Sequence, residues 1–396
     1  MESSKRNNQL FIDAESLSTL ALVQEGLIHP VDKLMTHEEA VEVRRTKMYK
    51  GVSFPFPFLL TPSGTKNEAC LKSVKKGDVV QLIHEKTVVG ELTVDETFDI
   101  DPKDRLKCIY GTDDPSHPGV KNTMKRLGNI AVTGDYHVNY PLLTASKKMV
   151  QEKIKETDAK RISALILAAN PLHRAHERMI RQVLDQSDLV VIFLLKPFSN
   201  TGLRYDIRYD ALLKFIESFL PANKVMIVPL ENSYIFAGYN ELILDALVAK
   251  NYGCTNLMIG KNHAGLGLFY DHDKLNSIFD ATKDIEINVQ TVEQYVYCNK
   301  CRTLVSTSVC PHGQHHHVHY HSDSILKLIN AGMMPPSVLV RREVSANILS
   351  TLFPDRFDNL QELYDAIMPN DGLMEEHSEE DFYIKLMGLY QTTSLT

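Results

Sequence analysis

Between residues 161 and 260 the chain alternates apolar runs with amphipathic stretches, and this rhythm constrains the fold more than any other feature. The apolar runs are RISALILAA, LVVIFLL, KVMIVPL and TNLMIG, and helical patterns follow the first three of them. Buried apolar strands joined by helical crossovers form a parallel sheet that is covered on both faces. The sequence therefore predicts an α/β domain with a doubly wound parallel sheet.

The segments on either side do not show this alternation of apolar and amphipathic runs. Residues from about 20 to 140 give short β-rich runs broken by turns, and a charged helical connector follows at about 145 to 160. A Cys/His-rich stretch begins near residue 297, and the remaining chain has mostly helical patterns. Since 396 residues are too many for one ordinary core, we expect three domains, at 1–160, 161–296 and 297–396.

Charge and composition exclude several classes of protein. The formal net charge is -7, with 43 basic and 50 acidic residues, and no block of Lys and Arg could follow a nucleic-acid backbone. No apolar run approaches membrane-spanning length, and the N-terminus lacks the apolar core of a signal peptide. We expect a cytoplasmic protein that binds neither nucleic acid nor membrane.

Two histidines three residues apart follow the first predicted strand, in the segment NPLHRAH at 170–176. In such sheets ligands bind at the carboxyl ends of strands, where helix N-termini present N–H groups to anions. We expect Asn170 to cap the helix and Pro171 to lie in its first turn. His173 and His176 would then share one face, where they could bind phosphate oxygens and offset the charge of leaving pyrophosphate. The alternative is a pair of surface histidines on an amphipathic helix.

The last predicted strand of this domain ends at Gly260 and continues into KNHAGLG. Gly265 and Gly267 allow the backbone to approach a ligand closely, and Lys261 supplies a positive charge. A phosphate-binding loop is the functional interpretation, and an ordinary glycine turn is the alternative.

Three of the six cysteines cluster, at Cys298, Cys301 and Cys310, and several histidines follow them. Three thiolates and one imidazole make a tetrahedral structural zinc site, whereas the scattered remainder argues against a disulfide framework. The alternative is three unpaired thiols in a loop. The spacing leaves the fourth ligand open among His312, His315, His316 and His317.

In this order, the motifs resemble those of the ATP sulfurylase (sulfate adenylyltransferase) family, over nearly the whole chain. HPGVKNT at 117–123 is similar to a segment near the end of the family's PUA-like N-terminal domain, and NPLHRAH is similar to its HxxH signature. AGYNELILDALVAKNYG resembles the helix that starts AGPREA in the family, and GKNHAGLG resembles GRDHAG. YCNKC with STSVCPH resembles the zinc-bearing segment of bacterial and archaeal members, and RREVSANIL resembles the last shared element.

The resemblance implies an HxxH-type nucleotidyltransferase that uses Mg²⁺ with ATP and transfers AMP to sulfate, giving adenosine 5′-phosphosulfate and pyrophosphate, or runs in reverse. It implies that Asn170, His173 and His176 contact the ATP phosphates. It implies a homodimer with a structural Zn²⁺, completed by His316, which aligns with the family's histidine after Cys-Pro-His. The nucleotide and anion pocket would be formed by Lys261, Asn262, His263, Ala264 and Gly265.

The departures from the family bear on the acceptor. Leu167 and Ala169 replace the glutamine and arginine that hold sulfate in the family, and Lys261, Asn262 and Asn240 replace an arginine, an acid and an arginine. Charge-assisted hydrogen bonds are worth about 1.5–3 kcal/mol each, so these losses should weaken sulfate binding. Two alternatives follow: a different oxyanion or small acid as acceptor, or an inactive nucleotide-binding relative with a regulatory or scaffolding role. If sulfate is used, Lys196, Arg204 or Lys261 would have to supply the missing charge.

Overall fold

The computed structural model describes residues 8–198, 202–260, 280, 282–368 and 375–390. Among the described helices, none is long and apolar enough to cross a membrane. The chain divides into two compact units. One consists of Met1–Ile166, Leu195–Phe198 and Val228–Thr291, and the other of Leu167–Leu194, Ser199–Ile227 and Val292–Thr396.

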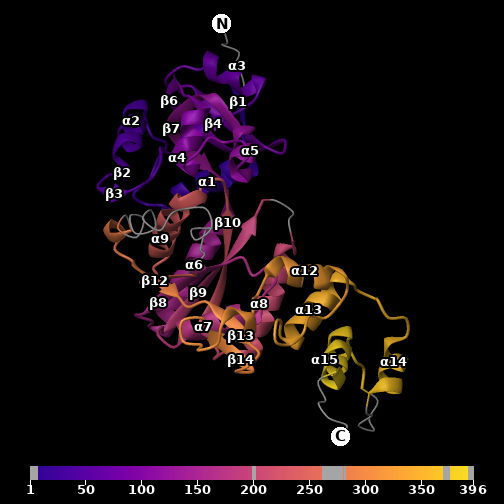
Figure 1. Ribbon diagram of the computed structural model, residues 1–396. Helices are drawn as coiled ribbons and strands as arrows, with labels where there is room; N and C mark the ends of the chain where they lie inside the picture. The colour runs from indigo at the N-terminus through magenta and orange to yellow at the C-terminus, as the bar shows by residue number, and fades with distance from the viewer. Residues whose placement is uncertain (1–7, 199–201, 261–279, 281, 369–374, 391–396) are drawn as a thin grey trace. The chain divides into compact units, whose positions relative to one another are not determined.

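The N-terminal sheet has the strand order β1-β5-β6-β7-β4, and β1, β4, β6 and β7 are labelled in Figure 1. Its strands are β1 (Gln9–Phe11), β4 (Leu60–Pro62), β5 (Val79–His84), β6 (Thr87–Asp99) and β7 (Leu127–Val138). β1 pairs with β5 in parallel, whereas the other neighbouring pairs are antiparallel. The β5–β6 hairpin turns at Glu85 and Lys86, whose φ values of 48° and 70° suit a tight turn between twisted strands. The predicted β-rich N-terminal domain is confirmed.

Helices accompany this sheet, and their ends carry recognisable caps. They are α1 (Ala14–Gln24), α2 (His37–Thr46), α3 (Thr65–Ser73), α4 (Pro102–Tyr110), α5 (Pro118–Met124) and α6 (Pro141–Thr157), with a small hairpin of β2 (Met48–Tyr49) and β3 (Val52–Ser53). Thr36 and Glu39 form a capping box at the start of α2. Asp101 caps α4, and Pro102 occupies the first turn, where its missing N–H costs nothing.

The second sheet has the order β10-β9-β8-β11-β12, so the strand order reverses beside β8. Its elements in chain order are β8 (Ile162–Leu167), α7 (Arg174–Leu184), β9 (Leu189–Pro197), α8 (Tyr205–Phe219), β10 (Val225–Asn232), η1 (Gly238–Asn240), α9 (Glu241–Asn251), β11 (Asn256–Gly260), η3 (Lys283–Ile285) and β12 (Asn288–Val292). β8 and β11 pair in parallel. Every residue of β8 is buried, as an apolar run in a covered sheet should be. The predicted α/β domain with a parallel sheet is confirmed, and its strands begin within about two residues of the predicted runs.

The C-terminal part contains a small sheet and then helices. The sheet is β14-β13-β15, made of β13 (Tyr295–Cys298), β14 (Thr303–Ser306) and β15 (His317–Val318), with η4 (Gln314–His316) between the last two. The helices are α12 (Ser322–Asn330), α13 (Arg342–Leu352), α14 (Leu360–Ile367) and α15 (Glu379–Tyr390). Tyr364, Met368 and Phe382 form a buried apolar cluster that packs α14 against α15.

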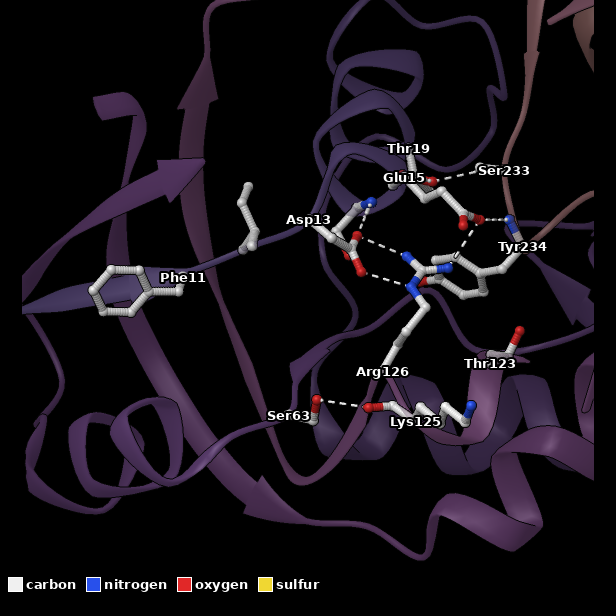
Figure 2. Close-up of polar contacts among 12 residues, drawn as sticks. Phe11, Asp13, Glu15, Thr19, Ser63, Thr123, Lys125, Arg126, Ser233 and Tyr234 are labelled. Carbon is white, nitrogen blue, oxygen red and sulfur yellow. Dashed lines mark hydrogen bonds and ion pairs between the residues drawn. The ribbon is translucent and has the colours of Figure 1, made fainter. Parts of the chain in front are cut away.

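Arg126 joins two acidic side chains of α1 and its cap, as Figure 2 shows. Its guanidinium donates two hydrogen bonds of 2.6 Å to the carboxylate of Asp13, the N-cap of α1, and lies 2.8 Å from Glu15. Glu15 also accepts a 2.7 Å hydrogen bond from the backbone N–H of Tyr234, and the Arg126 guanidinium lies 4.8 Å from the Tyr234 ring centre. Nearby, Thr19 donates to Ser233 at 3.0 Å. This network therefore ties α1 and Arg126, the residue before β7, to the segment that follows β10.

Candidate active site

His173 and His176 close the first turn of α7 by capping each other. His173 is the N-cap, and its Nδ1 accepts a hydrogen bond from the backbone N–H of His176 at 3.4 Å. His176 Nδ1 in turn accepts from the backbone N–H of His173, also at 3.4 Å. This is the reciprocal pattern of a capping box, which Ser or Thr and Glu or Gln usually form. The expectation that Asn170 caps this helix with Pro171 in its first turn is wrong, because both residues precede the N-cap.

The two imidazole rings stack, with centroids 3.6 Å apart and planes inclined by 14°. His173 is only 6% exposed. Burial lowers the pKa of His176 to about 4, and burial together with the neighbouring His176 lowers the pKa of His173 well below its ordinary value. Both rings are therefore neutral near pH 7. Since each Nδ1 accepts a hydrogen bond, each ring carries its proton on Nε2, and this N–H has no partner in the part of the chain that the structure describes.

Asn170 is held by the loop that precedes α8. Its Oδ1 accepts a 2.9 Å hydrogen bond from the backbone N–H of Leu203. Gly202, with a φ of +81°, lies so close that a Cβ added there would meet Asn170 Nδ2 at 2.0 Å. Only glycine fits beside the amide, and Asn170 is thereby fixed upstream of the histidines.

The start of α7 is also bound to the segment that leads into α13. Glu177 is 3% exposed and forms ion pairs with Arg174 at 2.7 Å and with Arg341 at 2.8 Å. The guanidinium of Arg341 lies 3.8 Å from the ring centre of Phe219. The backbone N–H of Arg174 donates to the carbonyl of Leu339 at 2.9 Å. Because the backbone N–H groups of Arg174 and His176 already have acceptors in the protein, the imidazole Nε2–H groups are the better donors for an anion at this turn.

Leu167 and Ala169, which replace the sulfate-holding residues of the family, are both buried. Leu167 is 5% exposed, and Ala169 is fully buried with a φ of +45°. Between them, the carbonyl of Ala168 accepts a 2.6 Å hydrogen bond from Arg208, which also donates to the carbonyl of Leu203 at 3.1 Å. The loop after β8 is thus supported by a buried guanidinium that bonds to backbone, and neither Leu167, the last residue of β8, nor Ala169 in the loop carries a polar side chain.

Two of the three cations considered as replacements, Lys196 and Arg204, are paired with carboxylates. Lys196 lies 3.3 Å from the carboxylate of Glu231, which also accepts a hydrogen bond from Tyr140, and Arg204 pairs with Asp206 at 2.6 Å near the surface. The predicted pocket residues Lys261, Asn262, His263, Ala264 and Gly265 lie outside the described residues.

Asn240, at the position of the family's AGPREA arginine, has a structural partner. It is 1% exposed, and its Nδ2 donates to the carbonyls of Cys108 and Ile109 at 2.9 and 3.0 Å. These carbonyls belong to the last turn of α4, where no helical N–H is available to them. Asn240 therefore satisfies a helix end, as an amide side chain can.

The three clustered cysteines come together with a histidine around a possible metal position. The ligand atoms of Cys298, Cys301, Cys310 and His312 all lie within 4.8 Å of one another. Here the structure differs from the expectation of His316: the Nδ1 of His312 lies 3.4 Å from Cys298 Sγ and 3.2 Å from Cys301 Sγ, whereas the ring of His316 packs on those of His312 and His315. Three thiols and one imidazole in this arrangement are the donor set of a structural zinc site.

One aromatic side chain at the histidines was not predicted from the sequence. The ring of Tyr320 lies 5.2 Å from that of His173, with planes inclined by 24°, and its hydroxyl donates to the carbonyl of Val338 at 2.7 Å. The only sequence signal is one tyrosine within the run HHHVHYH, and nothing in that run points to a residue near 173.

Comparison of the sequence with models of known protein families identifies two matches. The family model named ATP-sulfurylase matches residues 142–351, and a PUA-like domain model matches residues 1–139. The chain belongs to the ATP sulfurylase family. It is therefore a nucleotidyltransferase with a PUA-like N-terminal domain, as the sequence motifs predicted.

Curated ATP sulfurylase relatives match most of the chain. The sulfate adenylyltransferase of Halothermothrix orenii is 30% identical over 85% of this chain and 90% of the relative, and that of Staphylothermus marinus is 27% identical over 90% and 96%. A solved structure described as a hexameric APS kinase from Thiobacillus denitrificans has the same fold, with a TM-score of 0.65 at 18% identity. That match covers 88% of this chain and 63% of the other, so the chain spans less than two thirds of that protein.

Proposed function

We propose that this ATP sulfurylase family member transfers AMP from MgATP to sulfate, releasing pyrophosphate, or catalyses the reverse reaction. The observation that carries the proposal is the pair of stacked imidazoles, His173 and His176, at the first turn of α7. Both are neutral, and Nδ1 of each ring bonds to the helix while Nε2–H has no hydrogen-bond partner among the described residues. Donors fixed in advance stabilise charge that develops in a transition state better than water does.

In this proposal each imidazole donates a hydrogen bond to an oxygen of the ATP phosphates. This hydrogen bond becomes stronger as negative charge moves onto the leaving pyrophosphate. A neutral donor suits the reverse direction as well, since it does not trap the pyrophosphate as a permanent cation would. Asn170 would contact the same phosphates from its fixed place beside Gly202. Lys261, Asn262, His263, Ala264 and Gly265 would form the rest of the nucleotide and anion pocket, and Mg²⁺ bound with ATP would neutralise phosphate charge.

A second acceptor class is favoured by a specific observation. Leu167 and Ala169 are buried and apolar, whereas a sulfate dianion needs several hydrogen-bond donors. Arg208 is committed to the carbonyls of Ala168 and Leu203, and Arg204 to Asp206. An acceptor with a single anionic group and an apolar part, such as a small carboxylic acid, therefore fits these two substitutions better than sulfate does.

Pyrophosphate release from MgATP distinguishes the acceptors. The full chain would be assayed with sulfate, with other tetrahedral oxyanions and with small carboxylic acids, each over a range of concentrations. Saturation by sulfate supports the first acceptor, and release only with a carboxylic acid supports the second. The matched control is the double variant H173N/H176Q, which should release no pyrophosphate with any acceptor. Absence of acceptor-dependent release from the wild type would contradict adenylyl transfer itself.

The metal site, the domain boundaries and the oligomeric state are also proposals. We infer that Cys298, Cys301, Cys310 and His312 hold a structural Zn²⁺, since four ligands leave no open position for catalysis. Domains at 1–160, 161–296 and 297–396, and a homodimer, agree with the resemblance to the family and remain proposals.

A further inference from the structure

The ring of His173 has a second aromatic neighbour besides His176. Tyr320 lies 5.2 Å away by ring centroids, with planes inclined by 24°, and the three side chains form a continuous run of rings. Aromatic pairs at such spacings favour defined relative orientations. Tyr320 thus has the geometry to restrict how the His173 ring turns about its bond to Cβ.

Tyr320 is itself fixed by the segment that holds the start of α7. Its hydroxyl donates to the carbonyl of Val338 at 2.7 Å. The next carbonyl, that of Leu339, accepts from the backbone N–H of Arg174, the residue after His173. Consecutive carbonyls therefore anchor the tyrosine and the helix turn whose imidazole it contacts.

The other anchor of Tyr320 is the cysteine cluster. β15 ends at Val318, two residues before the tyrosine, and it pairs with β13 so that Cys298 lies opposite His317 and Tyr297 opposite Val318. His317 Nε2 also lies 3.4 Å from Cys310 Sγ. A paired strand of the small sheet thus leads directly from the cluster to Tyr320.

We propose that Tyr320 is a positioning residue for His173, which it holds in the orientation that directs Nδ1 to the helix and Nε2–H to the ligand. The inference rests on the proposed function, in which that Nε2–H contacts ATP. Without the tyrosine ring, the imidazole gains room to turn and to meet water, so part of the population loses the Nδ1 hydrogen bond and carries its proton on Nδ1. The expected cost is roughly 2- to 10-fold in the population of the productive orientation.

The test compares Tyr320→Leu with Tyr320→Phe in the full chain. Tyr320→Phe keeps the ring and loses only the bond to Val338, whereas Tyr320→Leu removes the ring. Tyr295→Leu is the matched control, because Tyr295 also packs on α7 but does so at Gln182 and Arg178, further along the helix than His173. The first readout is the ¹⁵N spectrum of the imidazoles, with His173 assigned by its absence in H173N.

We expect Tyr320→Leu to shift the His173 nitrogens toward a mixture of tautomers and to lower kcat about 2- to 10-fold with little change in the KM for ATP. Tyr295→Leu should retain the wild-type spectrum and kcat, and Tyr320→Phe, which keeps the ring but loses one of its two anchors, should lie closer to the wild type than Tyr320→Leu does. An unchanged His173 spectrum in folded Tyr320→Leu overturns the inference, and so does an equal shift in Tyr295→Leu. If Tyr320→Leu does not fold, Tyr320→Met carries the same comparison. An absence of acceptor-dependent pyrophosphate release would contradict the proposed function. The spectra do not depend on turnover, so they would still test the role of Tyr320.

Discussion

At the residue scale, His173 and His176 each serve the helix with one ring nitrogen and leave the other for a ligand. An alanine substitution at either position therefore removes two roles at once. Asparagine is a good N-cap, and glutamine is a usual third residue of a capping box, so these replacements keep the cap while they remove the imidazole.

We predict that H173N and H176Q each lower kcat by roughly 10²–10³, because each loses one donor to developing charge. Their free energies of unfolding should stay within about 1 kcal/mol of the wild type, whereas H173A should lose about 1 kcal/mol more through the missing cap. Steady-state kinetics and urea unfolding measure the two effects separately. Wild-type turnover in both capped variants would show that the histidines belong only to the helix.

The low pKa values of the two imidazoles predict a pH dependence of stability. In the unfolded chain both histidines take up a proton near pH 6.5, whereas in the folded chain His176 does so only at about 4 and His173 well below its ordinary value. The unfolded state therefore binds more protons between these values, and stability falls as the pH drops from about 6.5 toward 4. Each group contributes a slope of up to about 1.4 kcal/mol per pH unit.

Urea unfolding at a series of pH values from 7.5 to 4.5 checks this dependence. H173N/H176Q should show a smaller loss of stability on acidification than the wild type, while its stability near pH 7.5 changes little. Parallel curves for the two proteins would mean that the imidazoles are not protected from protonation.

The sequence predicted which residues form this turn but not what each does there. Asn170 was the natural choice of cap by side-chain preference, yet its amide bonds to Leu203 and a histidine takes the cap. His312 and His316 could not be separated by spacing, since both are within reach of the cysteines along the chain. Tyr320 meets His173 through the pairing of β15 with β13 and the bond of its hydroxyl to Val338, neither of which a local pattern near either residue encodes.

At the scale of elements, the strands of the second sheet were predictable because a covered parallel strand requires an unbroken apolar run. β8 and β9 follow such runs closely, and the first six residues of β9 are buried. The two-residue strand β15 lies in histidine-rich sequence, and β13 has the alternating burial of a strand but only four residues, YVYC, so neither is long enough for its sequence pattern to predict it. Their position depends on the contacts around the cysteine cluster.

Metal content tests how that small sheet is held. We predict about one zinc per chain, lost in Cys301→Ser with a clear fall in Tm, because a structural site contributes folding free energy. His312→Asn should also lose zinc, whereas His316→Asn, the matched control, should keep it. Retention of zinc by His312→Asn together with its loss from His316→Asn would reassign the fourth ligand. Metal analysis of protein purified without chelators provides the measurement.

Gly202, in the loop before α8, has no room for a side chain. We predict that Gly202→Ala is destabilising by more than 1–2 kcal/mol, since its φ of +81° disfavours a side chain and its Cβ would displace the Asn170 amide. Gly26→Ala is the control, because Gly26 has a similar φ of +69° with nothing within 4 Å of the added Cβ. Only Gly202→Ala should also lower kcat. Equal stability and activity in the two variants would contradict a role of Gly202 in fixing Asn170.

At the scale of the whole molecule, the family models and the compact units divide the chain differently. The PUA-like model ends at residue 139, but the first compact unit continues through 166 and includes 228–291. The ion pairs of Arg126 with Asp13 and Glu15, and the bond from Tyr234 to Glu15, lie inside this unit. Sequence similarity therefore marks a boundary that the network crosses.

We predict that Arg126→Gln lowers the free energy of unfolding by about 2–4 kcal/mol, because it leaves two partly buried carboxylates without their cation. Lys76→Gln, which breaks an exposed pair with Asp95, should change the free energy of unfolding much less, because solvent screens an exposed pair. Denaturant titration of both variants measures the difference. Similar losses in the two would mean that the Arg126 network is no stronger than a surface ion pair.

The bond from the Tyr234 N–H to Glu15 has a consequence for dissecting the protein into fragments. A gene truncated after residue 139 would encode a PUA-like piece whose Arg126 and Glu15 have lost the loop that covers them. Such a piece should be prone to proteolysis and poorly expressed on its own, and swapping it with the corresponding piece of a relative should succeed only when residues 231–237 are exchanged with it. The segments that must be exchanged together in this enzyme are thus separated from each other along the gene.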